Sequence, residues 1–148
     1  MHLQHIIIIN RPVAEVWEFL KQPNSEATWH PSLVEEKMTS EAGLQVGATG
    51  VQVWKVFGRR VESPWEIIEF EPGRKITTRS MGGPTAWEGT YLLEPSGEAT
   101  RFTLDLRQEA TGLGRLFAPL TDRLFRRQWM SDLALLKQVV EARRPAGG

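Results

Sequence analysis

Two side chains of this 148-residue sequence are candidates for moving a proton, His30 and Tyr91. His30 stands between Trp29 and Pro31 and is the only histidine away from the N-terminus. A neutral imidazole suits a general base or a ligand contact near pH 7, and a phenol can donate or accept a hydrogen bond. A lone histidine is more often structural, so the residue types alone leave both roles open.

The sequence contains no motif for other kinds of catalysis. The chain has no cysteine, which excludes disulfides, thiolate metal ligands and cysteine nucleophiles. His2, His5 and His30 do not have the spacing of metal ligands. The glycines of Gly82-Gly83-Pro84 lack the Lys-Ser/Thr of a phosphate loop, and no Gly-x-Ser-x-Gly occurs. We therefore expect neither a metal nor a cofactor.

Charge and hydropathy narrow the possible partners. Lys plus Arg and Asp plus Glu each number 18, so the formal net charge is zero and gives no indication of nucleic-acid binding. The basic stretch at Arg123, Arg126 and Arg127 is best interpreted as a solvated helix face. The longest apolar run, Ile6–Ile9, is far shorter than the roughly 20 residues of a membrane span. We expect a cytoplasmic monomer or homodimer without stable membrane insertion.

The six tryptophans are the unusual feature of the composition. Such large side chains either fill a core or line an apolar pocket, and hydroxyl groups among them could orient a ligand. These hydroxyl groups more often bond to backbone or trapped water. The predicted ligand-contacting residues are Trp29, Trp54, Trp65, Thr78, Ser80, Trp87, Tyr91, Phe102, Leu104, Phe117 and Trp129.

Several elements are needed to bring these residues together. Residues 3–9 are apolar and β-branched, which predicts a first strand. A helix is expected over residues 13–20, where apolar side chains recur with helical spacing, and a second short helix over 24–30. From 33 to 109, glycine and proline breakers recur at strand-length intervals and predict a meander of about six strands.

Alternation within the meander predicts one apolar face and one charged face. The simplest turns place Trp54, Trp65 and Trp87 on the apolar face, opposite Phe117 and Trp129 of a C-terminal helix. The sequence after residue 112 has helical periodicity, and its proline at position 119 should kink the helix or separate its first turn. Residues 143–148 are expected to form a tail of a single domain that spans residues 1–148.

This order of elements resembles the START-like or Bet v1-like (SRPBCC) superfamily, and within it the polyketide cyclase/dehydrase branch. The resemblance rests on residues 11–17, on Trp29-His30-Pro31, on residues 65–74 with their Glu71-Pro72-Gly73-Arg74 turn, and on the Leu-rich terminal helix. It implies an α+β helix-grip fold, in which a curved antiparallel sheet of about seven strands wraps around a long C-terminal helix, with two short helices after strand one. It also implies a cavity between sheet and helix.

The resemblance leaves three functions open, because a fold by itself does not specify chemistry. The first is binding of an apolar or aromatic small molecule, such as a lipid, a quinone or a polyketide-like compound. The second is a polyketide cyclase or dehydratase that uses the same cavity, with Tyr91 and His30 as the residues to mutate. The third is a cochaperone-like interaction module, which would have a filled interior and an exposed apolar patch.

Overall fold

The computed structural model describes residues 1–83, 85–110 and 112–143, which form one sheet and one long helix with shorter helical segments. Of the predicted tail at 143–148, residues 144–148 lie outside the described residues. In chain order the elements are β1 (His2–Ile9), α1 (Val13–Leu20), the 3-10 turn η1 (Glu26–Thr28), β2 (Leu33–Met38), β3 (Thr49–Val56), β4 (Arg59–Glu71), β5 (Lys75–Ser80), β6 (Thr85–Ser96), β7 (Ala99–Ala110), the 3-10 segment η2 (Gly112–Phe117) and α2 (Ala118–Ala142).

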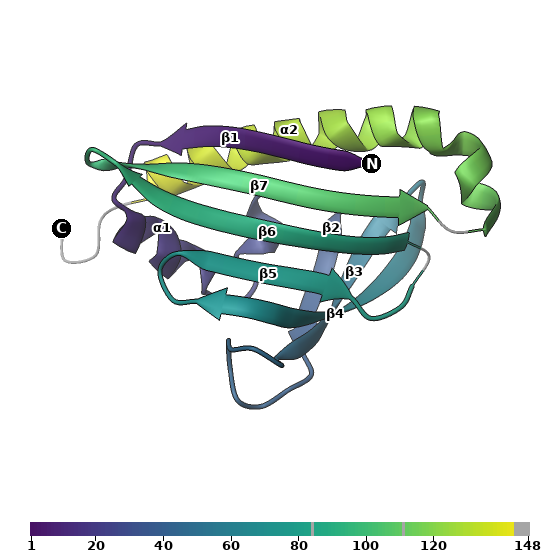
Figure 1. The fold of residues 1–148 in the computed structure, drawn as a ribbon, viewed down its shortest axis with the longest axis horizontal. Coiled ribbons are helices and arrows are strands. Elements are labelled where there is room, and N and C mark those ends of the chain that lie inside the picture. Colours follow the sequence, from purple (N-terminus) through teal and green to yellow (C-terminus); the bar gives the residue numbers. More distant parts are fainter. Residues whose placement is uncertain (84, 111, 144–148) are drawn as a thin grey trace.

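The strands make a seven-stranded sheet in the order β1-β7-β6-β5-β4-β3-β2. Every neighbouring pair is antiparallel. Figure 1 shows a curved sheet, in which β2 and β3 stand at an angle to β6 and β7, while α2 runs along β1. The predicted helix-grip fold is confirmed.

One end of the sheet collects several connections. Because neighbouring strands are antiparallel, β3, β5 and β7 run in one direction and finish at the same end. The β3–β4 turn at 57–58, the β5–β6 connection at 81–83 and the segment 115–124 around the beginning of α2 therefore gather there (Figure 1). We call these three segments the helix-start end.

The strand register agrees with the predicted faces even where the turns differ. At the β3–β4 turn, Val61 pairs with Trp54 instead of Val56. The two-residue turn expected at Gly58-Arg59 lies one residue earlier, at Phe57-Gly58. Phe57 and Gly58 adopt the positive φ values, 49° and 78°, that such a hairpin turn requires. The resulting shift is two residues, so each side chain stays on its predicted face.

The core forms where α2 covers the concave face. Its buried side chains Leu133, Leu136 and Val140 pack in one cluster with Phe102 and Leu104 of β7. Full burial of such a side chain contributes about 1.5–3 kcal/mol. No helix in the described ranges is long and apolar enough to cross a membrane.

The helical segments follow the breakers in the sequence. Pro119 lies in the first turn of α2, and η2 is separate from α2, as predicted from the missing proline donor. The second short helix expected over 24–30 is reduced to the single 3-10 turn η1. Asn24 has a φ of 62°, a left-handed conformation that a helix cannot continue through.

Candidate functional site

A buried histidine–aspartate pair joins the turn before β2 to helix α2. His30 Nδ1 lies 2.7 Å from Oδ2 of Asp132. The two residues are 1% and 4% exposed. One helical turn earlier, Gln128 donates its Nε2 hydrogen to Oδ1 of Asp132 at 2.7 Å. The Asp132 side chain is therefore held through both of its oxygens.

This hydrogen bond assigns the proton on the imidazole ring. A carboxylate only accepts, so Nδ1 carries the hydrogen and Nε2 presents its lone pair. Burial lowers the pKa of His30 below its ordinary 6.5, although the hydrogen bond and the charge of Asp132 oppose the shift. Nε2 is buried and has no hydrogen-bond partner in the described part of the chain. His30 is thus neutral at pH 7 with an unpaired acceptor.

Three tryptophans surround the imidazole ring. Trp29 packs against it with a centroid distance of 3.8 Å, and Trp54 and Trp129 meet it edge-on at 5.3 and 4.6 Å. The Nε1 atom of Trp29 is also buried without a partner among the residues that the structure describes. Trp54 and Trp129 keep part of their surface exposed. We call His30 and these tryptophans the indole–histidine site.

A carboxyl cluster lies on the neighbouring strands and on η1. Gln52 of β3 donates its Nε2 hydrogen to Glu26 at 2.9 Å and lies 3.4 Å from a carboxyl oxygen of Glu36 on β2. Burial and the charge of Glu36 raise the pKa of Glu26 to about 8, against hydrogen bonds from Gln52 and Tyr91. Burial also raises the pKa of Glu36 and that of Tyr91. Glu26 therefore keeps its proton at pH 7.

The carboxyl cluster and the indole–histidine site adjoin. The backbone N–H of His30 donates to the carbonyl oxygen of Glu26 at 2.9 Å. The Tyr91 ring lies 6.0 Å from that of Trp29, and the charges of Glu26 and Asp132 both contribute to raising the pKa of Tyr91. In chemical terms the interior combines a neutral base with a protonated acid. Across the described ranges no three His, Asp or Glu side chains are grouped as metal ligands.

The structure brings together part of the predicted ligand set. Trp29, Trp54 and Trp129 meet at His30, and Tyr91 joins them through the carboxyl cluster. Their role in ligand binding remains a prediction. Phe102 and Leu104 lie under α2 in the closed core.

Other members of the set lie around Trp65, away from His30. Trp87 donates its indole hydrogen to Ser63 and its backbone N–H to the hydroxyl of Ser80, each at 3.0 Å. The Ser80 hydroxyl is thus bonded to backbone, which was the commoner alternative. Thr78 is half-buried on the same face. Trp65 is buried, and its indole nitrogen has no partner in the described chain.

Phe117 is placed differently from the expectation that it faces the sheet. Its side chain is 65% exposed at the end of η2. The 3-10 geometry before Pro119 breaks the helical periodicity on which the expectation depended, so the ring turns toward solvent. The predicted contact between Phe117 and the concave face is therefore corrected.

Four polar residues of the interior were missed by the sequence analysis, namely Glu26, Glu36, Gln52 and Asp132. Gln52 stands two residues before Trp54 on β3, so the alternation that assigned Trp54 to the concave face also assigns Gln52. Asp132 falls between Trp129 and Leu136 on the buried face of α2, where a charged residue is a signal. Glu26 and Glu36 had no comparable signal.

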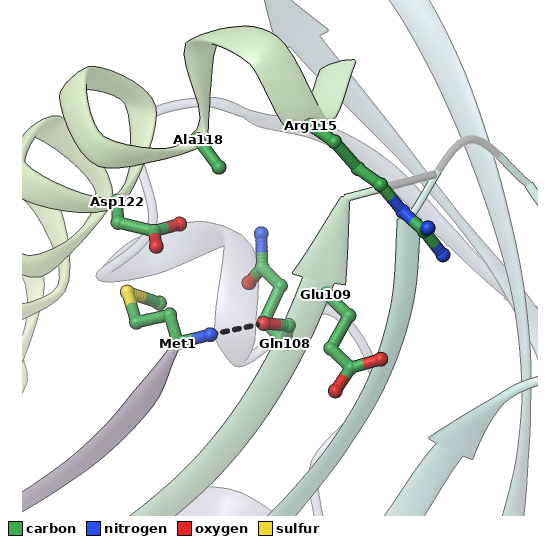
Figure 2. A pocket seen from close by; sticks show the side chains of 6 residues that line it. All are labelled: Met1, Gln108, Glu109, Arg115, Ala118 and Asp122. Atoms are coloured by element: carbon green, nitrogen blue, oxygen red, sulfur yellow. Dashed lines mark hydrogen bonds between the residues drawn. The ribbon is translucent and has the colours of Figure 1, made fainter. Parts of the chain in front are cut away.

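Two open pockets lie outside the indole–histidine site. One, with a volume of about 320 Å³, lies at the helix-start end and is shown in Figure 2, where the amino group of Met1 donates to the carbonyl oxygen of Gln108 at 2.6 Å. It is lined by Met1, Gln108, Glu109, Arg115, Ala118 and Asp122. The other, of about 590 Å³, lies between the beginning of α1 and the turns of the opposite end.

Solved structures with the same architecture come from several bacteria. A protein of Thermus thermophilus matches with a TM-score of 0.82 and 22% identity, and the match covers 100% of both chains. The Zhui aromatase/cyclase of Streptomyces sp. R1128 has a TM-score of 0.79 and 21% identity, with 100% of this chain and 98% of that chain covered. A START superfamily protein of Mycobacterium smegmatis has a TM-score of 0.80 and 13% identity over 95% and 97%. At these identities the likeness shows the fold.

The sequence itself identifies the family. No curated protein sequence is significantly similar to the chain. A family described as polyketide cyclase / dehydrase and lipid transport matches residues 2–141, nearly the full length. That span includes η1, the strands that carry the carboxyl cluster, and Asp132 of α2. The chain therefore belongs to the polyketide cyclase / dehydrase and lipid transport family.

Proposed function

We propose that the protein binds an apolar or aromatic small molecule between the concave sheet and α2, with a polar group of the ligand at His30. The supporting observation is that Asp132 holds Nδ1 of this histidine while Nε2 stays unpaired among three indole rings. An unpaired buried acceptor costs about 1–3 kcal/mol. A hydroxyl group of a bound ligand would remove that cost.

The ligand class follows from the surfaces around His30. Trp29, Trp54 and Trp129 offer flat, rigid, apolar walls, which favour aromatic or polycyclic molecules over flexible polar ones. The family description, with its polyketide and lipid members, supports the same class. A polyketide-like, quinone-like or lipid ligand with one terminal hydroxyl group fits these features, because a hydroxyl group can donate a hydrogen bond to Nε2 of His30.

Two probes that differ by one hydroxyl group test the proposal. Binding of naphthalene and 2-naphthol is followed by quenching of tryptophan fluorescence. We expect wild type to prefer 2-naphthol by about threefold to tenfold, the net worth of one hydrogen bond. His30→Leu should remove this preference while keeping affinity for naphthalene, whereas His2→Leu, at an exposed histidine, should keep it.

A second variant covers the case in which His30→Leu does not fold. Trp129→Phe should weaken both probes alike, because it trims the wall and keeps His30. The proposal fails if neither probe quenches the wild-type protein and native mass spectrometry of the purified protein finds no retained apolar molecule. Equal affinity of wild type and both variants would also contradict it.

Catalysis is the second candidate, and the opposite pKa shifts of Glu26 and His30 favour it. The pKa of Glu26 is raised to about 8 by burial and the Glu36 charge, while burial lowers that of His30, so an acid and a base coexist at pH 7. In the dehydration of a β-hydroxy ketone, His30 Nε2 would take the proton on the carbon beside the carbonyl. Glu26 would give its proton to the departing hydroxyl, which leaves as water. Proton return through solvent restores both groups.

One assay distinguishes ligand binding alone from catalysis. 4-Hydroxy-4-phenylbutan-2-one, an aromatic β-hydroxy ketone, loses water to give a conjugated enone that is followed by its absorbance. If the protein is an enzyme, Glu26→Gln and His30→Asn each lower kcat by about a hundredfold or more with little change in KM, as does Tyr91→Phe if its phenol takes part. Absence of turnover, together with binding of the ketone, supports a carrier.

A further inference from the structure

Half of the exposed large apolar residues in the described chain lie at the helix-start end, six of twelve. Phe57, at the tip of the β3–β4 turn, is 83% exposed, and Leu116 of η2 is 76% exposed. Phe57 also has a left-handed φ of 49° in this two-residue turn. The six residues, which we call the apolar rim, are Phe57, Met81, Leu116, Phe117, Leu120 and Leu124.

The apolar rim includes a second apolar face of α2. At 100° per residue, Leu120 and Leu124 project on the side opposite Leu133 and Leu136, which are fully buried against the sheet. The helix is therefore apolar toward the core and, over its first turns, apolar toward solvent. Exposed apolar side chains that gather at one end of a molecule are typical of an interaction surface.

Arginines flank the apolar rim, and the exposed Glu109 of β7 lies in the pocket beside it. Between residues 115 and 128 the chain carries four arginines and one acidic residue, although the whole chain has zero net charge. Arg115, Arg123 and Arg127 are exposed beside the leucines, and Arg59 is exposed next to Phe57. The acidic residue, Asp122, is half-buried in the pocket of Figure 2.

We infer that the apolar rim docks the protein peripherally on an anionic lipid surface. Phe57 and the leucines would enter the boundary between headgroups and acyl chains, and the arginines would lie among the headgroup phosphates and carboxylates. An amphipathic helix with arginines beside leucines is suited to this position. Each basic residue near an anionic membrane strengthens binding by about fivefold. The flanking arginines favour an anionic lipid surface over an uncharged occupant.

The docked orientation places a pocket at the lipid surface. Arg115, Ala118 and Asp122 line the open pocket of Figure 2 and belong to the same segment as the apolar rim. An apolar compound dissolved in the membrane would thus meet the protein beside this pocket. Docking needs no bound ligand, so it can be tested apart from the proposed function.

Vesicle co-sedimentation of the full chain tests the inference. Vesicles of phosphatidylcholine alone are compared with vesicles of equal parts phosphatidylcholine and phosphatidylserine. We expect the protein to sediment with the anionic vesicles and to be released by high salt. Leu120→Ser with Leu124→Ser should weaken association by about tenfold or more, and Arg123→Gln with Arg127→Gln by about fivefold per arginine.

Matched controls come from the rest of the surface. Val46→Ser removes an exposed apolar residue in the β2–β3 loop, and Arg101→Gln removes an exposed arginine on β7. Both should bind vesicles like wild type, and the leucine variant should still bind 2-naphthol if the proposed function holds. Equal sedimentation of wild type and the leucine variant, or none by wild type, overturns the inference. A concentration-dependent dimer abolished by the leucine substitutions would assign the surface to a second copy instead.

Discussion

Two histidine–aspartate pairs of almost equal length have different consequences in this protein. His2 Nε2 lies 2.8 Å from Asp105 on the exposed face, and His30 Nδ1 lies 2.7 Å from Asp132 inside. Outside, water solvates either charge state, so the pair is worth little. Inside, each partner depends on the other for its hydrogen bond, and the pair decides which imidazole nitrogen is free for a ligand.

Substitution of Asp132 should show how strongly the buried pair is coupled. We expect Asp132→Ala to lower the free energy of unfolding by about 2–3 kcal/mol, because it leaves both His30 and Gln128 without an acceptor. Asp105→Ala should cost less than about 1 kcal/mol. Urea denaturation of both variants measures the difference, and equal losses would contradict the buried role of Asp132.

Glu26 should make stability depend on pH in an unusual direction. Burial and the charge of Glu36 raise its pKa from 4.5 to about 8, so the folded state holds a proton that the unfolded state releases. The unfolding free energy should therefore fall as pH rises between 4.5 and 8, by at most about 1.4 kcal/mol per pH unit for this carboxyl. Glu36, whose pKa burial also raises, acts in the same direction.

The effect of Glu26 can be separated from that of His30. Burial lowers the pKa of His30 from 6.5, so the folded state favours the neutral imidazole. The contribution of His30 to the free energy of unfolding is therefore complete above pH 6.5 and is lost only as the pH falls below that value. Between pH 6.5 and 8 the carboxyl effect remains. Glu26→Gln should flatten the decline there, whereas Glu98→Gln, at an exposed turn, should retain it. Denaturant titrations that show identical slopes for wild type and Glu26→Gln would refute this assignment.

Among the elements, β3 and β4 pack closely where Gly50 of β3 meets Trp65 of β4. A Cβ atom at Gly50 would lie 2.6 Å from Cε2 of Trp65 and 2.7 Å from the carbonyl oxygen of Lys37. The indole therefore packs directly on the β3 backbone. This close approach explains why Trp65 is buried although it is not part of the indole–histidine site.

Adding one methyl group should disturb this contact. Gly50→Ala is expected to destabilise the protein by about 3 kcal/mol, because backbone on one side and a rigid indole on the other cannot both move away. At Gly89 a Cβ would meet only Cδ1 of Leu106 at 3.4 Å, an ordinary contact with a flexible side chain. Gly89→Ala should cost far less. Thermal unfolding compares the two, and similar melting temperatures would refute the packing argument.

At the scale of the whole molecule, ligand binding and folding should be linked through α2. Asp132 and Trp129 belong to α2, while His30 belongs to the chain before β2, so the indole–histidine site exists only in the folded state. A ligand at one hundred times its Kd should raise the free energy of unfolding by about 2.7 kcal/mol.

Thermal unfolding with 2-naphthol tests this linkage. Wild type should gain stability with ligand concentration, and Trp129→Ala should lose most of the gain. Trp17→Ala is the matched control, because the ring of Trp17 packs on Phe70 and is not among the three indoles around His30, so this variant should be less stable but keep the ligand effect. A gain that survives Trp129→Ala unchanged would place the ligand elsewhere.

Much of the fold could be predicted because its signals are local. The breakers between strands, the alternation along them and the proline near the beginning of α2 depend on neighbouring residues, and the structure confirms each of them. The exact pairing at the β3–β4 turn could not be predicted, since it depends on Phe57 accepting a left-handed conformation. Phe117 was misplaced because a 3-10 segment does not follow the helical period.

The sequence by itself determined the order of the strands and helices and the sheet face to which Trp54, Trp65 and Trp87 belong, because alternation and helical period are properties of adjacent residues. It offered His30 only as a candidate. Only the tertiary structure decided that His30 is hydrogen-bonded to Asp132, 102 residues away, and that burial and the charge of Glu36 raise the pKa of Glu26. Burial, charge proximity and the choice of a hydrogen-bond partner arise between segments that are distant in the chain, so no local pattern encodes them.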